Sequence, residues 1–230
     1  MTRPDDTRPE SDGTTSAPSA GQLRVPAGAR LVLATHNAHK VGELRAILAP
    51  ALPGLDPASV LGARDVHAPE PVEDGVTFEQ NALIKARALA AATGLPAVAD
   101  DSGLSVDVLG GAPGIFSARW AGRHGDDAAN LALLLAQLAD VPAEHRRARF
   151  VCAAALVTPD GTEHVERGTL EGTLAAAPRG AHGFGYDPVL VPLGDTRTCA
   201  ELTPQEKNAI SHRGQAFRAL VPHLVAALRP

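Results

Sequence analysis

Short, continuous apolar runs that alternate with helical patterns constrain the fold of this 230-residue chain more than any other feature. Residues 31–34 form such a run, which is typical of a buried strand, and a helical pattern follows through residue 48. Another helix is expected from Thr77 to about Ala92, and a second apolar run follows at 96–99. This alternation predicts an α/β domain.

The rest of the chain predicts further helices and an antiparallel hairpin. A hairpin inside an alternating pattern favours a mixed sheet over a purely parallel one. Pro222 is expected to interrupt the last helix, because proline removes a backbone donor. The expected segments are a helix at 126–139, strands at 149–157 and 164–174, a capped helix start at 203–206 and a final helix from about 215.

Residues 1–29 differ in composition from the rest of the chain. They are rich in Pro, Asp, Ser, Thr, Gly and Ala without periodicity, so they cannot bury enough apolar surface to offset the entropy of ordering. We therefore expect a disordered leader at 1–29 and one enzyme-sized domain at 30–230.

Charge and cysteine content exclude several classes of protein. The chain has 21 Lys and Arg against 26 Asp and Glu, and a net charge of −5 argues against non-specific binding to nucleic acid. Two cysteines, Cys152 and Cys199, are too few for a disulfide framework or a zinc ribbon. The apolar stretches are far shorter than a membrane span, and the N-terminus has no signal-peptide core. We expect a cytoplasmic protein with neither nucleic acid nor membrane as a partner.

The expected strand-to-helix junction at 35–40 has the chemistry of a phosphate site. A helix N-terminus offers unpaired amides and the positive end of the helix dipole, and its side chains add donors and a lysine charge. An ordinary helix cap with a solvated lysine is the alternative, and the P-loop pattern is absent. The candidate substrate-binding residues here are Thr35, His36, Asn37, Ala38, His39 and Lys40.

Two acidic segments flank the helix expected at 77–92. Glu70, Glu73 and Asp74 precede it, and Asp100 with Asp101 is expected to end the strand that follows it. Hard cations such as Mg²⁺ bind carboxylate and phosphate oxygens, so the two segments together could hold a metal against a nucleotide. Turn and cap chemistry is the alternative explanation.

A glycine-rich run at 180–188 is a candidate nucleobase site. Phe184 and Tyr186 lie in this run although only 3% of the chain is aromatic, and both can stack on a base while Asp187 reads its edge. Alternatively, the aromatic rings anchor the loop to the core.

Donors on the helices complete the candidate site. Lys85 shares a helix face with Asn81, four positions earlier. Lys207, His212 and Arg213 form a cluster of donors that suits a purine carbonyl or a phosphate.

Taken in order, these motifs resemble those of the inosine/xanthosine triphosphate pyrophosphatase family. The resemblance covers about residues 31–228, and several ordered motifs are more specific than any one alone. The motifs are Thr35-His36-Asn37 with Lys40, Phe78 with Asn81 and Lys85-Ala86, Ala99-Asp100-Asp101-Ser102-Gly103-Leu104, Gly110-Gly111-Ala112-Pro113-Gly114-Ile115, Gly183-Phe184-Gly185-Tyr186-Asp187-Pro188 and Ser211-His212-Arg213.

The resemblance implies an elongated mixed α/β fold, a homodimer and Mg²⁺ as cofactor. It also implies cleavage between the α- and β-phosphates of ITP, dITP or XTP, which yields a nucleoside monophosphate and pyrophosphate. A 6-carbonyl accepts hydrogen bonds from Lys and Arg, whereas the 6-amino group of adenine would leave those buried donors unpaired. His36 stands where many relatives have glycine.

The resemblance also assigns roles to residues. Asp101 would be the general base, with Asp100 beside it, and Glu73 with Asp101 would hold Mg²⁺. The residues expected to bind substrate are Thr35, His36, Asn37, Ala38, His39, Lys40, Lys85, Ser102, Phe184, Gly185, Tyr186, Asp187, Lys207, His212 and Arg213.

Two other functions remain open from the sequence. A pyrophosphatase of the septum-inhibitor-like (Maf-like) family would act on ordinary or modified pyrimidine triphosphates through a similar phosphate site. A nucleotide sensor without catalysis would use the same pocket, although two adjacent carboxylates suit a triphosphate only with a metal between them.

Overall fold

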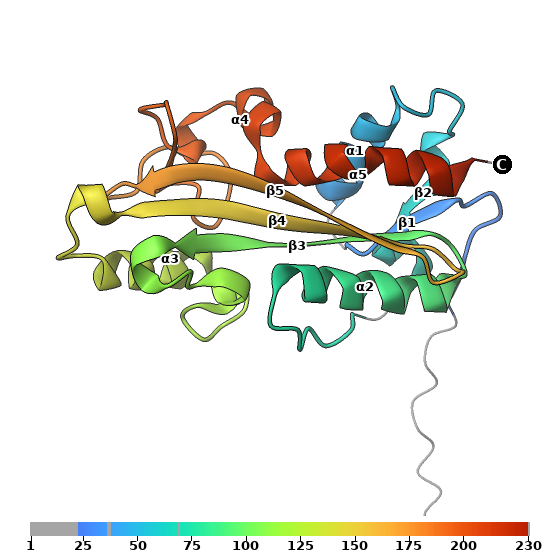
Figure 1. The fold of residues 1–230 in the computed structure, drawn as a ribbon, viewed down its shortest axis with the longest axis horizontal. Helices are drawn as coiled ribbons and strands as arrows, with labels where there is room; N and C mark the ends of the chain where they lie inside the picture. Colours follow the sequence, from blue (N-terminus) through green and yellow to red (C-terminus); the bar gives the residue numbers. More distant parts are fainter. Residues whose placement is uncertain (1–22, 36–37, 69, 230) are drawn as a thin grey trace, which may run out of the picture.

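Three long antiparallel strands run along the long axis of the molecule and carry its other elements (Figure 1). The computed structural model describes residues 23–35, 38–68 and 70–229. The sheet order is β2-β1-β3-β4-β5-β6, with β1 parallel to both its neighbours and the remaining pairs antiparallel. The predicted mixed sheet is therefore confirmed. The strands are β1 Leu31–Leu33, β2 Val60–Gly62, β3 Ala97–Val106, β4 Arg147–Val157, β5 Glu163–Leu174 and β6 Leu190–Pro192.

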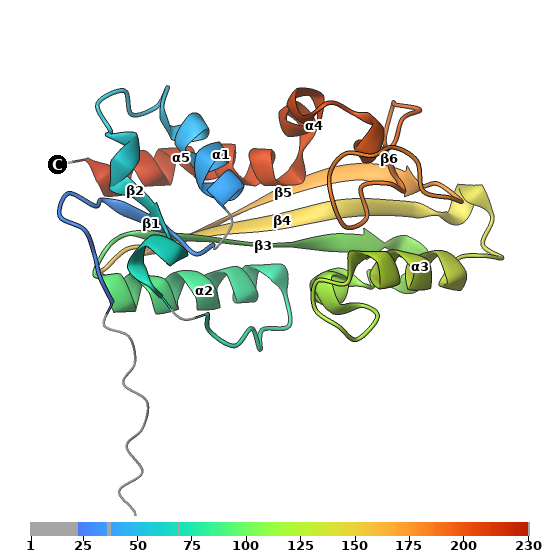
Figure 2. The ribbon, with the colours of Figure 1, turned by 180° about the vertical axis from the view of Figure 1, so that it is seen from behind.

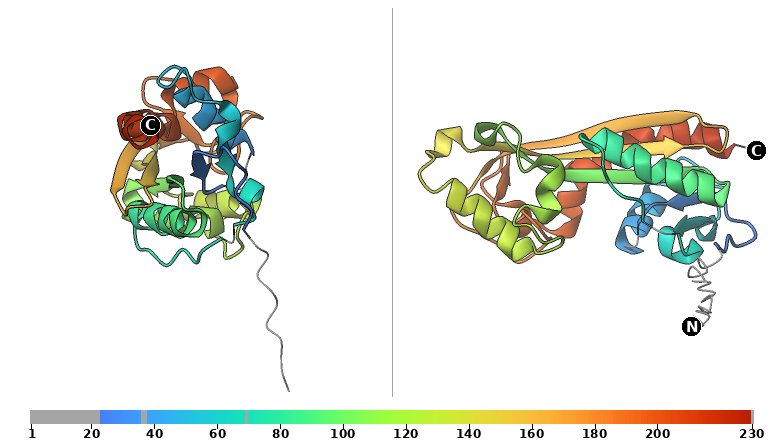
Figure 3. Two further views of the ribbon diagram at one scale, coloured as in Figure 1. Left: turned by 90° about the vertical axis from the view of Figure 1, so that its right-hand side faces the viewer. Right: turned by 90° about the horizontal axis from the view of Figure 1, so that it is seen from below.

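Helices cover both faces of this sheet. Helix α2 lies along one face and α5 along the other, with α1 beside the short strands and α3 and α4 toward the opposite end (Figures 1 and 2). The view down the long axis in Figure 3 shows α2 and α5 separated by the sheet. None of the helices within the described ranges has the length and apolar character needed to cross a membrane. The helices are α1 Ala38–Leu48, α2 Phe78–Thr93, α3 Asp127–Gln137, α4 Pro204–Ile210 and α5 His212–Leu228.

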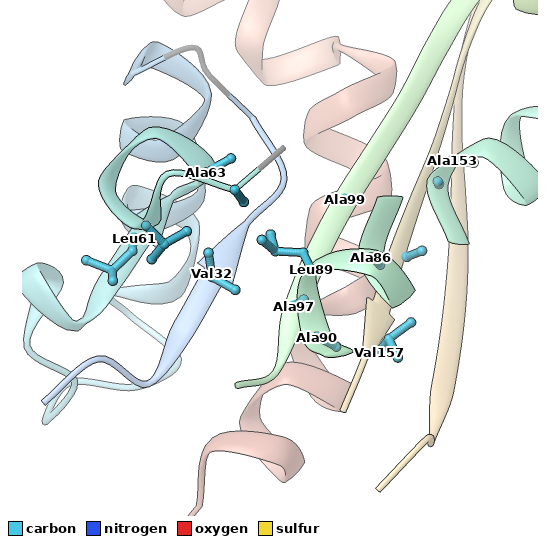
Figure 4. Packing of buried hydrophobic residues seen from close by; sticks show 14 of the residues in the cluster. Val32, Leu61, Ala63, Ala86, Leu89, Ala90, Ala97, Ala99, Ala153 and Val157 are labelled. Carbon is cyan, nitrogen blue, oxygen red and sulfur yellow. The ribbon is translucent and has the colours of Figure 1, made fainter. Parts of the chain in front are cut away.

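Small side chains line the core between α2 and the sheet (Figure 4). Ala86 and Ala90 of α2 belong to the same buried cluster as Ala97, Ala99 and Ala153 of β3 and β4. Because alanine adds only a methyl group, the helix can lie close to the strands, which brings its other side chains within reach of β3. Larger side chains fill the α5 face, and a third cluster fills the end beside α3.

Most of the expected leader at 1–29 lies outside the described residues. Within residues 23–29 the structure has no helix or strand, but Leu23 and Ala29 pack against the α2 cluster. The amide of Arg24 also donates to the carbonyl of Val66 at 3.4 Å.

Strand β3 does not end at Asp100 as the sequence pattern indicated. It continues to Val106, because β4 pairs with it along its whole length and places Ala154 opposite Asp100 and Ala153 opposite Asp101. Strand β1 pairs with β3 only as far as Val98, so the two carboxylates lie just beyond the end of β1. Neighbouring residues of a strand point to opposite faces, which separates the two acidic side chains.

The last helix also differs from expectation. It begins at His212, where Ser211 caps it by accepting a hydrogen bond from the Gly214 amide at 3.0 Å, and it continues through Pro222. An interior proline costs about 3 kcal/mol, but burial of each large apolar side chain contributes about 1.5–3 kcal/mol, so the buried stripe of α5 outweighs the loss. That stripe consists of Phe217, Leu220, Leu224 and Leu228.

Candidate active site

A cavity of about 420 Å³ opens where β3 extends past the end of β1. Its walls come from β3, α2, the segment 115–127, the loop 184–187 and the junction of α4 and α5. A second cavity of about 300 Å³ shares four of its lining residues and is also lined by Thr35. The two cavities are therefore neighbouring parts of one cleft. The shared residues are Glu73, Lys85, Asp100 and His124.

Lys85 links two carboxylates at the centre of the cleft. Its Nζ lies 3.1 Å from Glu73 Oε1 and 3.3 Å from Asp101 Oδ1, and its side chain is only 14% exposed. One helical turn earlier, Asn81 Nδ2 donates to the other oxygen of Asp101 at 3.3 Å. Helix α2 thus holds both oxygens of the Asp101 carboxylate.

Burial and neighbouring opposite charges have opposite effects on the pKa values of Asp101 and Lys85. Burial is the largest influence on Asp101 and raises its pKa above the ordinary value, although Lys85 and Asn81 oppose the shift. For Lys85, burial acts to lower the pKa, but attraction to Asp101, Asp100 and Glu73 outweighs it and leaves the pKa raised. Lys85 is therefore a permanent cation beside a carboxylate that is more basic than usual.

The donor set suits a hard cation that completes its shell with other ligands. Within the described residues, no group of three or more His, Cys, Asp or Glu side chains is arranged to hold a metal ion. Glu73 and Asp101 supply carboxylate oxygens on either side of the Lys85 ammonium, so this place already accommodates positive charge. Mg²⁺ commonly binds through one or two carboxylates together with waters and phosphate oxygens, so these residues fit it.

Asp100 also lines the cleft, at the edge of the sheet beyond β1, but pairs with α5 on the face opposite α2. Its carboxylate lies 3.1 Å from Arg213 Nε and accepts a hydrogen bond from Ser102 Oγ at 3.2 Å. Only 1% of the Asp100 side chain is exposed. Removing one partner of such a buried pair is strongly destabilising, so Arg213 and Asp100 hold α5 and β3 together.

The loop 183–187 presents one exposed aromatic ring. Phe184 is 63% exposed, and Lys207 Nζ lies 5.2 Å from its ring centroid. The buried Asp187 carboxylate accepts hydrogen bonds from the Phe184 amide at 2.8 Å and from Lys207 at 2.5 Å. Gly183 has φ +77°, and a Cβ there would lie 2.1 Å from Asp187 Oδ2, so the loop requires glycine.

Tyr186 and His212 line the same cavity from the core side. Tyr186 is 5% exposed and donates through its hydroxyl to the Ser117 carbonyl at 2.9 Å, while burial raises its pKa. Its position favours anchoring of the loop over stacking on a base. The ring of His212 stacks on Phe150 with centroids 5.0 Å apart.

The proposed phosphate segment is described only in part. His36 and Asn37 lie outside the described residues, and of Ala38, His39 and Lys40 only the backbone, in the first turn of α1, is described. Thr35 is buried and lines the smaller cavity, which Glu73 and Lys85 also line.

Several residues of the cleft were not assigned from the sequence. Asn81 was placed on the Lys85 face without a role, and Arg119, His124 and Asp127 were not considered, although all three line the larger cavity. Their segment lies against β3 at Gly103, where a Cβ would be 2.5 Å from Ser117 Oγ. The glycine-rich motif at 110–115 was the one available signal for this packing.

Comparisons with known proteins agree on one family. The sequence profile of the Ham1 family matches residues 31–223. A dITP/XTP pyrophosphatase of Streptomyces coelicolor is 71% identical over 194 residues, which are 84% of this chain and 96% of that protein. A dITP/XTP pyrophosphatase of Leifsonia xyli is 58% identical, over 87% of this chain and 98% of that protein.

Solved structures give the same result. A nucleoside-triphosphatase (dITP/XTP pyrophosphatase) from Mycobacterium abscessus is 54% identical with a TM-score of 0.71, and covers 84% of this chain and 99% of its own. A HAM1 protein from Coxiella burnetii is 41% identical with a TM-score of 0.78, and covers 86% of this chain and 99% of its own.

Proposed function

This chain belongs to the Ham1 family, and on that premise we propose that it hydrolyses ITP, dITP and XTP to the nucleoside monophosphate and pyrophosphate. The observation that carries the proposal is a single cleft with two chemically different ends. One end has an exposed aromatic ring beside a lysine, and the other has carboxylates held around a second lysine. Such an arrangement suits a nucleobase at one end and a polyphosphate at the other.

At the base end, Phe184 stacks on the purine and the donors select its substituents. Lys207, His212 and Arg213 supply hydrogen-bond donors, and Asp187 holds Lys207 in place. A 6-oxopurine satisfies these donors, whereas the 6-amino group of adenine leaves them unpaired, which can reject the wrong base strongly.

At the phosphate end, positive groups bind the triphosphate. Lys85 and Thr35 lie in the cleft, and the N-terminus of α1 with Lys40 adds amides and charge. Glu73 and Asp101 would hold Mg²⁺, which would neutralise phosphate charge and the charge that develops on the leaving pyrophosphate. The proposed role of Lys85 is to hold these carboxylates and contact the same phosphates.

The chemical step requires a base near the α-phosphorus. Asp101 takes a proton from water, whose oxygen forms a bond to the α-phosphorus while the bond to the bridging oxygen of the β-phosphate breaks. Asn81 with Lys85 orients the carboxylate for this role, and in the protein without a metal ion burial raises the pKa of Asp101. Asp100 keeps Arg213 in position from the opposite face of the sheet.

We further propose a cytoplasmic homodimer, for which light scattering at micromolar concentration is the test of assembly.

The deciding experiment measures pyrophosphate release from ITP, dITP, XTP, ATP, GTP and dTTP, with Mg²⁺ and with a chelator. We expect rapid, Mg²⁺-dependent release from the first three. Preference for dTTP would favour the septum-inhibitor-like alternative. Binding without release would favour a nucleotide sensor, and equal rates on ATP and ITP would contradict the proposed selection of the base.

A further inference from the structure

The loop that carries Phe184 is tied to two distant segments of the chain. Asp187, at one end of the loop, binds Lys207 and accepts a hydrogen bond from the Ala200 amide at 3.1 Å, whereas the residues next to Phe184 bind a different segment. The amide of Gly185 donates to Asp127 Oδ2 at 2.9 Å across 58 positions in sequence, and the Tyr186 hydroxyl donates to the Ser117 carbonyl at 2.9 Å. Both acceptors belong to the segment 115–127 that lines the larger cavity. The backbone next to Phe184 is therefore positioned by that segment.

Phe184 has Lys207 beside it, with Nζ 5.2 Å from the ring centroid, but most of its side chain is exposed. Its ring is 63% exposed, and glycines with positive φ, Gly183 at +77° and Gly185 at +59°, flank it. Glycine has more backbone freedom than any other residue, so this stretch needs external contacts to keep one conformation. The Asp187 contact to the Phe184 amide is internal to the loop, and the pair of Asp187 with Lys207 holds the loop from the side of α4.

Asp127 can bind the loop of Phe184 because the neighbouring Asp126 serves as the cap of helix α3. Asp126 is the N-cap of α3 and accepts a hydrogen bond from the Ala129 amide at 3.1 Å. Asp127, the first residue of α3, instead directs its carboxylate to Gly185 and lines the cavity. Two adjacent carboxylates thus have separate partners.

We propose that Asp127 is a positioning residue for nucleobase recognition, which holds Gly185 so that the neighbouring Phe184 ring is set to stack on the purine. This inference rests on the proposed function, because it assumes that Phe184 contacts the base. The same contact is made in the ground state and in the transition state, so its loss should weaken binding without slowing the chemical step.

The test compares Asp127→Ala with Asp127→Asn. Alanine removes the acceptor of a charge-assisted hydrogen bond, so KM for ITP should rise about tenfold while kcat stays close to wild type. Asparagine retains an oxygen acceptor and should restore most of the lost affinity. Product inhibition separates the two ends of the cleft: the inhibition constant of inosine monophosphate should rise about tenfold in Asp127→Ala, and that of pyrophosphate should not change.

Asp126→Ala is the matched control, because it removes the adjacent carboxylate and the cap of α3 but not the contact to Gly185. It should lower Tm and leave KM and both inhibition constants near wild type. An Asp127→Ala enzyme with normal KM and normal inhibition by inosine monophosphate would overturn the inference, as would equal weakening of both products. Wild-type protein that neither hydrolyses ITP nor binds inosine monophosphate would overturn the proposed function as well.

Discussion

Replacing Gly168 by alanine should disturb the candidate site, because Gly168 packs against the first turn of helix α5, which carries Arg213. Gly168 lies on β5, where a Cβ would be 2.0 Å from the His212 carbonyl oxygen and 2.7 Å from the Ala216 nitrogen. Ordinary contacts of a Cβ begin at 3.4 Å, so the first turn of α5 must move by at least 1.4 Å, the difference between 3.4 Å and 2.0 Å. Strand β5 cannot yield instead, because β4 pairs with it along its length.

Such a displacement has two measurable effects. Overpacking against backbone atoms costs about 3 kcal/mol, which for a chain of this size lowers Tm by about 6–12 °C. Arg213 is in the same helical turn and lies 3.1 Å from Asp100, so the shift also separates this pair. A misplacement of about 1 Å in an active site can cost about 100-fold in rate, and we expect a loss of that size in kcat/KM for ITP.

The assay combines thermal unfolding with pyrophosphate release from ITP and ATP. Gly172→Ala is the control, because a Cβ there would lie 2.2 Å from the Val191 carbonyl on the same strand but away from α5. It should lose stability while kcat/KM for ITP stays within a few fold of wild type. A Gly168→Ala enzyme with unchanged Tm and unchanged kcat/KM would refute the reasoning about this helix contact.

Three further predictions concern the carboxylates and a buried thiol. Asp101→Asn should lower pyrophosphate release from ITP by about 10²- to 10⁴-fold with little change in circular dichroism, and a near-normal kcat would contradict its role as base. Gly75→Ala would place a Cβ 2.6 Å from Asn81 Oδ1 and so displace the amide that orients Asp101. The kcat for ITP should fall by about 10- to 100-fold, and an unchanged kcat would exclude this coupling. Burial raises the pKa of Cys199 from 9.0 to about 12, so between these values the unfolded chain loses the thiol proton and the folded protein keeps it. The free energy of unfolding should therefore fall more steeply above pH 9 in wild type than in Cys199→Ala. Urea unfolding at several pH values measures this difference, and parallel pH profiles of the two proteins would count against a raised pKa of Cys199.

Much of the secondary structure was predictable because its signals are local. The helices α1, α2 and α3 and the β4–β5 hairpin lie where apolar periodicity and turn residues placed them. The strands β2 and β6 were not predicted, because each has three residues and ends in glycine or proline, whereas the equally short β1 lies in an apolar run of four residues. Asp100 and Asp101 were expected to end their strand because Asp-Asp-Ser-Gly has turn composition, yet pairing with β4 continues the strand through them to Val106.

The sequence by itself determined which chemical groups this protein has for a nucleotide: the acidic pair, Lys85 on the face of a helix, and a glycine-rich loop with Phe184. Those groups are recognisable because residue type and spacing specify their chemistry. Only the tertiary structure decided which groups meet. It turned Asp101 toward Lys85 and Asp100 toward Arg213, and it brought Asp127 to the loop of Phe184. Such contacts join positions far apart in the chain, and they depend on how the helices pack against both faces of the sheet, which no local pattern encodes.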